Sequence, residues 1–391
     1  MSRKKAIVLG FMGACPIAGV IWQHVHYIVG LKRLGYEVYY IEDTANWPYN
    51  PVTYEVSENY TYAADLLTRL AEQFDFKDHW AFVARFKNPI ESAGLPFAQV
   101  TQLYRESEIT LNICGSHDLN DELLETPCFV YVESDPGVEQ IKIDLKDEET
   151  MAYLGKHHFL FTFGENIGKA DFPVPTNGLT WYPTRQPVVT DFWHDPASPP
   201  EGAVMTSICN WSTSGLKDVE WRGERYLWSK SLEFLKFVEA PKLSGENFEL
   251  AVNMKKPEER ALFEKSGWRL SDPNAISIDW NLYNKYIRSS KGEYTVAKDQ
   301  YVRLNTGWFS DRTACYLASG RPAITQETGF TKFYGGKKEG LFAFSSMDEM
   351  VESVREINKD YKLHSQRAAE LAKEHFEAEV VLKSMLDKIN L

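Results

Sequence analysis

Residues 283–330 read YNKYIRSSKGEYTVAKDQYVRLNTGWFSDRTACYLASGRPAITQETGF, and this stretch decides the fold that we expect for the chain. Its loop at 306–312 (TGWFSDR) leads straight into an apolar helical run at 314–318, which a Ser-Gly pair ends. An apolar strand at 322–325 and a polar turn at 326–329 (QETG) follow. A helix and a strand flanked by two such turns form one half of a ligand pocket at the carboxyl edge of a parallel sheet.

The start of this helix is suited to an anion. Free backbone N–H groups and the positive end of the helix dipole point out of a helix N-terminus. Ser310 can cap the helix or donate a hydrogen bond, and Arg312 can form a forked contact with phosphate oxygens. We therefore expect Ser310, Arg312 and the loop amides from Gly307 to Asp311 to bind phosphate. A surface ion pair between Arg312 and Asp311 is the plain alternative.

The N-terminal part of the chain predicts a similar unit. An apolar strand at 5–9 ends in a glycine-rich loop at 10–19, a helical pattern continues to Leu34, and a second strand ends on Glu42-Asp43. This βαβ order is Rossmann-like, but the loop lacks the GxGxxG spacing, so we predict no dinucleotide site. Three later strands also leave through polar, glycine-containing turns, at 115–118, 133–137 and 164–168.

The length and the middle of the chain indicate two domains. At 391 residues the chain exceeds the size at which one hydrophobic core keeps growing. Residues 184–200 (TRQPVVTDFWHDPASPP) are rich in proline and lack periodicity, which is typical of a linker. Strands and helices alternate again after it, with a helix expected near 226–238, and 347–391 is helical. We predict an α/β protein with two Rossmann-like domains facing each other across a cleft.

Composition excludes several function classes. The net charge of -12 argues against general attraction to nucleic acid. The five cysteines show no CxxC spacing, so we expect reduced thiols, no metal site and a cytoplasmic protein. Because the chain has neither a signal-like apolar segment nor a run of about 18 apolar residues, we expect no membrane span. The absence of GxxxxGK[ST] disfavours phosphoryl transfer.

The residues quoted above carry a family resemblance. The Gly-Trp-x-Ser turn, the Gly-x-Pro after the helix and the Glu-Thr-Gly turn resemble the donor half of GT-B glycosyltransferases. Segments at 30–43, 134–137, 163–166 and 183–188 look like a bacterial group of GT-B-type proteins described only as glycosyltransferases.

This resemblance covers nearly the whole chain. It implies an acceptor domain at 1–190, a nucleotide-sugar donor domain at 201–365, and a C-terminal helix at 366–391 that packs back on the first domain. It also implies transfer of a sugar, of hexose type, from a nucleotide-sugar co-substrate to a hydroxyl acceptor. Neither a metal nor another cofactor is expected, since such enzymes hold the diphosphate with a helix dipole and basic groups.

The chain departs from the acidic motifs of two GT-B subfamilies. Retaining enzymes with a Glu-x7-Glu pair would place its acids near Gly307 and Cys315, and plant natural-product enzymes would place a Glu at Thr313. None of these residues is acidic here. The stereochemistry, the nucleotide, the sugar and the acceptor therefore stay open.

Further donor-binding candidates come from turns in the second half. Lys291 stands in a Ser-Lys-Gly-Glu turn, and Glu327 and Thr328 follow the strand at 322–325. Asn210 leaves the first strand of this half, together with Ser212 and Thr213. Solvated side chains and ordinary capped turns are the alternatives.

An inverting transfer also needs a base for the acceptor hydroxyl. Asp135 is the first choice because it follows a strand and would face the cleft, although Asp-Pro-Gly is also a common turn. His24, or its neighbour His26, and Glu165 are the other candidates, although helical histidines are commonly packed.

Two other functions stay open. A nucleotide-sugar epimerase of the same architecture would convert the donor without an acceptor. A non-catalytic two-lobed binding protein would close on its ligand and form no product.

Overall fold

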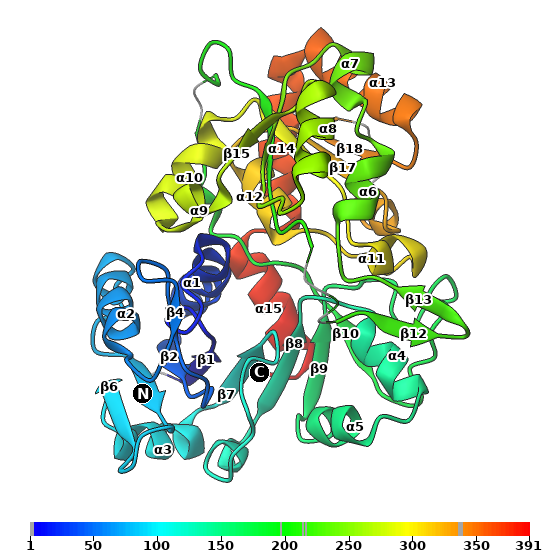
Figure 1. Ribbon diagram of the computed structural model, residues 1–391. Coiled ribbons are helices and arrows are strands. Elements are labelled where there is room, and N and C mark those ends of the chain that lie inside the picture. Colours follow the sequence, from blue (N-terminus) through cyan, green and yellow to red (C-terminus); the bar gives the residue numbers. More distant parts are fainter. Residues whose placement is uncertain (1–3, 196–197, 213–214, 216, 335–338) are drawn as a thin grey trace.

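The computed structural model describes residues 4–195, 198–212, 215, 217–334 and 339–391. Two separate sheets form the framework, one built from residues 5–183 and the other from residues 205–344 (Figure 1). No helix within the described ranges is both long and apolar enough to cross a membrane.

The first sheet has eight strands in the order β10-β9-β8-β7-β1-β2-β5-β6. Neighbouring strands are parallel except for β5 and β6, which are antiparallel at one edge. Because β2 lies on one side of β1 and β7 on the other, the chain changes direction at β1, where open α/β sheets bind ligands. The strands are β1 Lys5–Leu9, β2 Glu37–Glu42, β5 Trp80–Ala84, β6 Glu91–Gly94, β7 Ile109–Ile113, β8 Phe129–Glu133, β9 Phe159–Thr162 and β10 Trp181–Pro183.

Helices and one small hairpin accompany this sheet. Strands β1, β7 and β8 are almost entirely buried, which explains their continuous apolar sequences. The helices are α1 Ala18–Arg33, α2 Thr61–Gln73, α3 Phe97–Glu106, α4 Val138–Asp144 and α5 Glu148–Leu154, and the hairpin is β3 Tyr49–Asn50 with β4 Glu55–Val56.

The second sheet has six parallel strands in the order β15-β14-β11-β16-β17-β18. Its change of direction lies at β11, between β14 and β16. The strands are β11 Met205–Ile208, β14 Phe248–Ala251, β15 Arg269–Ser271, β16 Gly292–Thr295, β17 Ala323–Gln326 and β18 Leu341–Phe344. The helices are α6 Ser231–Lys236, α7 Ala240–Ser244, α8 Pro257–Lys265, α9 Pro273–Ser277, α10 Trp280–Ser289, α11 Asp299–Arg303, α12 Asp311–Ala318, α13 Met347–Lys359 and α14 Tyr361–His375.

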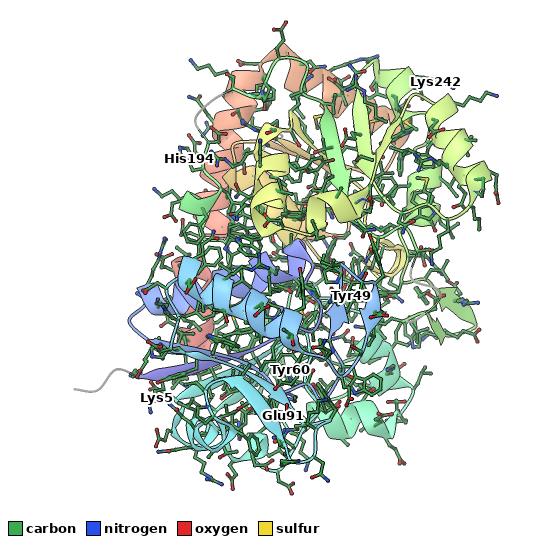
Figure 2. All side chains as sticks on the ribbon, turned by 60° about the vertical axis from the view of Figure 1, so that its left-hand side comes forward. Lys5, Tyr49, Tyr60, Glu91, His194 and Lys242 are labelled. Atoms are coloured by element: carbon green, nitrogen blue, oxygen red, sulfur yellow. The ribbon has the colours of Figure 1, made fainter. Side chains whose placement is uncertain are left out.

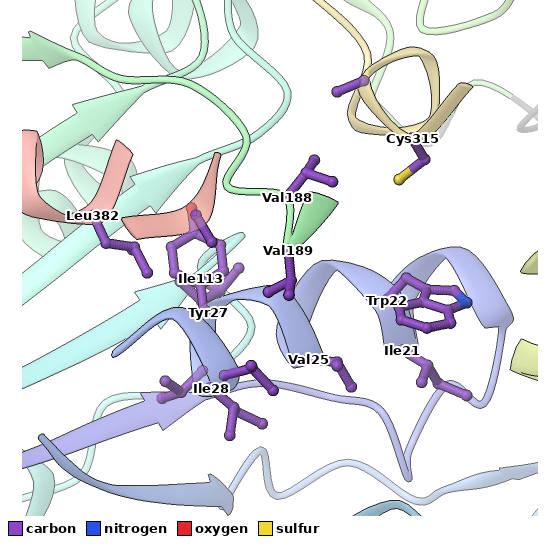
Figure 3. Close-up of a cluster of buried hydrophobic side chains, with 14 of the residues drawn as sticks. Ile21, Trp22, Val25, Tyr27, Ile28, Ile113, Val188, Val189, Cys315 and Leu382 are labelled. Carbon is purple, nitrogen blue, oxygen red and sulfur yellow. The ribbon is translucent and has the colours of Figure 1, made fainter. Parts of the chain in front are cut away.

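The last helix, α15 (Ala378–Lys388), returns to the first domain and packs on α1. A Cβ on Gly30 of α1 would lie 2.5 Å from Leu382 Cδ1, so glycine permits this close approach. Figure 3 shows Leu382, the linker residues Val188 and Val189, and Cys315 of α12 gathered around the apolar face of α1. The predicted fold is therefore confirmed, including the crossing helix.

One predicted helix is wrong in part. Residues 226–238 were expected to form one helix, but Tyr226 ends a hairpin of β12 (Val219–Trp221) and β13 (Glu224–Tyr226), and only α6 is helical. The hairpin reaches across to the first domain, where Trp221 Nε1 donates to Asp144 at 2.9 Å. Because its packing partner lies far away in the sequence, local periodicity could not predict it.

Candidate functional site

Two adjoining cavities lie at the carboxyl ends of both sets of strands. The large cavity, about 740 Å³, is lined by both domains, whereas the small cavity, about 510 Å³, is lined mainly by loops that follow β1, β2, β7 and β8. Both volumes are typical of small-molecule sites. The cavities meet at the residues that line both of them, namely Gln23, Asp135, Phe163, Trp228, Trp308 and Asp311.

Two helices begin at the large cavity. Ser310 precedes α12 and Ile17 precedes α1, and both residues line the cavity. Within the described residues, neither side chain caps the helix that it precedes. The first-turn N–H groups and the positive ends of two dipoles therefore border the same space. The sequence predicted this arrangement for α12.

Arg312 lines the large cavity in a fixed orientation. Its Nε lies 2.5 Å from the Glu293 carboxylate, Nη1 donates to the Ile208 carbonyl at 2.7 Å, and Nη2 donates to Thr295 Oγ1 at 2.8 Å. Burial opposes the charge, yet the Glu293 carboxylate raises the pKa of Arg312 above its usual value. The ion-pair partner is thus Glu293, whereas Asp311 accepts only the backbone N–H of Arg312.

The guanidinium has further N–H groups for a ligand. It carries five donors, and these three contacts use three of them. A ligand anion could therefore bind to Arg312 without displacing Glu293.

Lys230 lines the large cavity and was not marked by any sequence pattern. It is only 7% exposed, and no described residue forms an ion pair or a side-chain hydrogen bond with its ammonium group. Burial, together with the nearby Arg312 guanidinium, lowers the pKa of Lys230 to about 8. Its Nζ lies 5.8 Å from the centroid of the Trp308 ring. Lys230 is therefore a buried cation that no carboxylate of the described residues pairs with directly.

Asp135 lies where the cavities meet, as expected, but it is held by the second domain. Its Oδ1 accepts hydrogen bonds from Lys298 Nζ and the Tyr301 hydroxyl. Burial alone would raise the pKa of Asp135, yet Lys298 and Lys217 lower it to about 2. A carboxylate with so low a pKa is a poor general base near neutral pH, so the pairing argues against the base assignment.

His24 and Glu165, the other expected bases, line neither cavity. His24 is fully buried in the first domain, with Nδ1 2.7 Å from the Val20 carbonyl, and burial lowers its pKa to about 4. Glu165 pairs with Arg185 at 2.8 Å and accepts from the Tyr334 hydroxyl at 3.0 Å. The structure therefore corrects both placements, because these groups support the fold away from the cavities.

His26 does line the large cavity. Its Nδ1 lies 3.1 Å from the Val189 N–H nitrogen and its Nε2 lies 3.1 Å from Trp193 Nε1. Burial lowers the pKa of His26 to about 3, so this ring is neutral at physiological pH.

The donor-binding candidates divide into two groups. Ser310, Asp311, Arg312 and Asn210 line the large cavity. Lys291 does not, because it precedes β16 and so lies at the amino edge of the sheet, where it pairs with Glu246. Thr213 lies outside the described residues.

Gly307, Glu327 and Thr328 also lie outside both cavity linings. Gly307 has a φ of +74°, and a Cβ there would lie 2.8 Å from the Asn166 backbone nitrogen. Thr328 donates to the Trp308 carbonyl at 2.5 Å, and Glu327 accepts the Gly329 N–H at 2.5 Å. This turn therefore shapes the loop and the domain contact, and it lies outside both cavities, although it was expected to bind phosphate.

Among the described residues, no three His, Cys, Asp or Glu side chains lie together in a way that could hold a metal ion.

Solved structures match the chain over its whole length, whereas no protein-family model and no curated protein sequence matches it. An alpha-glucosyltransferase in complex with UDP and a 13-mer DNA containing a HMU base covers 100% of both chains, with a TM-score of 0.61 and 12% identity. Sucrose-phosphate synthase from Thermosynechococcus elongatus covers 99% of this chain and 98% of its own, with a TM-score of 0.54 and 10% identity. HepE from Anabaena in complex with UDP covers 99% of each chain, with a TM-score of 0.52 and 8% identity. These matches place the chain among proteins of the two-domain GT-B fold.

Proposed function

We propose that the protein is a glycosyltransferase that moves a sugar, of hexose type, from a nucleotide-sugar donor in the large cavity to a hydroxyl acceptor in the small cavity. The observation that carries this proposal is Lys230, a buried lysine that no described carboxylate pairs with. A buried ammonium group without a paired carboxylate favours the binding of an anion, because the anion offsets the free-energy cost of removing the charge from water.

The surroundings of Lys230 fit a diphosphate. Arg312 lies beside it with N–H groups to spare, and α12 presents its N-terminus to the same space. Phosphate oxygens bind to both kinds of group. Two of the structures with the same fold contain UDP, which supports a nucleoside diphosphate as the ligand.

The same groups explain how transfer would be accelerated. Negative charge develops on the diphosphate as the bond from the sugar to phosphate breaks. Lys230, Arg312 and the α12 amides would stabilise that charge in place of a divalent ion. The sugar would lie near Trp308 and Asp311, where the large cavity meets the small one.

Thermal-shift measurements with UDP, GDP and ADP test the donor site. Saturating nucleotide at about 100 Kd stabilises a protein by about 2.7 kcal/mol. We expect one nucleotide to raise the melting temperature of the wild type and to have a much smaller effect on Lys230→Met. If millimolar nucleotide leaves the wild-type melting temperature unchanged, the proposal is wrong.

Product analysis separates transfer from the other functions. A nucleotide sugar incubated alone would be epimerised by an epimerase, whereas a transferase needs an acceptor before it releases stoichiometric nucleotide. Tight nucleotide binding without any turnover would instead favour a binding protein.

A further inference from the structure

The segment between β2 and α2 carries exposed aromatic side chains to both cavities. Thr44, Asn46 and Trp47 line the small cavity, whereas Tyr49 and Tyr54 line the large one. Figure 2 shows Tyr49 at the level where the two domains meet. Trp47 lines the small cavity and is still 53% exposed, so much of its side chain stays accessible to a ligand.

This segment is held in place before any ligand binds. The Tyr49 N–H donates to the Ala14 carbonyl at 3.0 Å, and the Ala14 N–H donates to Glu42 at 2.9 Å. Ala45 and Tyr54 have φ values of 59° and 60°, which strain residues other than glycine. Strained backbone of this kind is concentrated at ligand-binding sites. The fold thus holds the backbone of the segment that carries Trp47.

The small cavity combines aromatic faces with hydrogen-bond acceptors. Glu139 lines it, and its Oε2 has no hydrogen-bond partner among the described residues. Asp311 also lines it, and its described hydrogen bonds come from backbone N–H groups, that of Arg312 at 2.9 Å. A sugar ring offers an apolar face of C–H groups and a rim of hydroxyl donors, which suits both kinds of group. The aromatic residues of the lining are Phe11, Trp47, Tyr131, Phe163, Trp228 and Trp308.

The charge of the small cavity argues against an anionic acceptor. Its lining contains four carboxyl groups, those of Glu133, Asp135, Glu139 and Asp311, and one lysine, Lys217. Burial would lower the pKa of Lys217, but Glu139 and Asp135 raise it overall. Burial and Glu139 raise the pKa of Glu133 well above its usual value. A raised pKa keeps the Glu133 carboxyl uncharged over a wider pH range, and Lys298 pairs with Asp135, so Glu139 and Asp311 remain to face the single cation Lys217. The lining therefore offers no excess positive charge to hold a phosphate.

We propose that the small cavity binds an uncharged saccharide as the acceptor, with its ring stacked on Trp47 and its hydroxyls bound to Glu139. This inference rests on the proposed glycosyltransferase function. The acceptor hydroxyl oxygen bonds to the anomeric carbon of the donor, and the bond from that carbon to the diphosphate breaks. The nucleoside diphosphate leaves with the electron pair, and the hydroxyl proton passes to water.

An acceptor panel tests the saccharide class. Methyl glycosides of common hexoses, octanol and a short single-stranded DNA are each incubated with the nucleotide sugar, and released nucleotide is measured. We expect release with at least one methyl glycoside and background release with octanol and DNA. Release that depends on octanol or DNA, or release with none of the panel in a protein that the nucleotide stabilises, overturns the inference. A protein that no nucleotide stabilises contradicts the proposed function instead.

Two variants of the segment test the role of Trp47. Trp47→Ala is expected to raise the KM for the methyl glycoside at least tenfold, with kcat within about twofold and the nucleotide thermal shift unchanged. Val52→Ala is the matched control, because Val52 is 65% exposed in the same segment and lines neither cavity. Equal KM values for the two variants would overturn the stacking role.

Discussion

Replacing Lys230 with methionine should stabilise the free protein and weaken nucleotide binding. The buried ammonium group has its pKa lowered from 10.5 to about 8. At about 1.36 kcal/mol per pKa unit, charging Lys230 in the fold costs roughly 3 kcal/mol. Methionine is unbranched and apolar, so it should fill the space without that cost. We expect a gain of about 1–3 kcal/mol in the free energy of unfolding at pH 7.

The gain should depend on pH in a defined direction. The unfolded lysine binds its proton up to about pH 10.5, whereas the folded lysine holds it only up to about pH 8. Below pH 8 both states are charged, so the wild type bears the whole cost. Between pH 8 and 10.5 the unfolded state binds more protons, so wild-type stability rises with pH. The advantage of Lys230→Met should therefore shrink toward pH 10.5.

Nucleotide binding should change in the opposite sense. A diphosphate favours the charged lysine, so wild-type affinity should fall up to about tenfold per pH unit above pH 8. The variant should bind more weakly at pH 7, and its affinity should lack this decline.

Urea unfolding at pH 7 and pH 10, with calorimetric titration of UDP, measures both effects. Lys242→Met is the control, since Lys242 is 50% exposed on the second domain and pairs only at the surface with Glu239 (Figure 2). That change should alter stability by less than about 0.5 kcal/mol. The reasoning would be refuted if Lys230→Met were less stable than the wild type. It would also be refuted if the variant bound nucleotide as tightly as the wild type at every pH.

Three further changes probe the site and its supports. Arg312→Ala should lower the free energy of unfolding by about 3–5 kcal/mol because it leaves the buried Glu293 unpaired. Adding Glu293→Gln should restore most of that loss in urea unfolding, while UDP binding stays weak; no restoration would contradict the pairing. Glu42 has its pKa raised from 4.5 to about 7 by burial, so the stability it contributes is lost as pH rises from 4.5 through 7. Glu42→Gln should remove up to roughly 3 kcal/mol of that pH dependence. A variant whose melting temperature varies with pH as in the wild type would disprove this. Gly307→Ala should destabilise the protein by about 1–3 kcal/mol more than Gly202→Ala. Gly202 is the control because its φ is similar, whereas no described atom lies within 4 Å of a Cβ added there. Equal melting temperatures for the two glycine variants would show that the collision is absent.

The fold was predictable because its signals are local. A buried parallel strand such as 5–9 is a continuous apolar run in the sequence. The end of the first helix is marked by a glycine, Gly35. The sheet edges were harder to predict. Strands β5 and β6, and strands β12 and β13, pair with their direct neighbours along the chain but show no clear apolar period. The β12–β13 hairpin also packs on a distant part of the chain, as the contact of Trp221 with Asp144 shows.

The site could be predicted only in outline. Ser310, Asp311 and Arg312 follow from a loop that opens a helix, and they line the large cavity. Lys230 and Lys298 carry no motif, and they become candidates only when burial and the facing domain are known.

By itself, the amino-acid sequence determined the βα alternation, the two domains, and the strand ends at which ligands bind. The tertiary structure decided which polar side chains face the cavities and which are bound to the protein. Asp135 and Glu165 both follow strands in similar turns, yet Asp135 meets Lys298 at the cavity and Glu165 meets Arg185 away from it. Such differences arise because pKa and accessibility depend on partners elsewhere in the chain, 20 residues away for Glu165 and 163 residues away for Asp135, which no local pattern encodes.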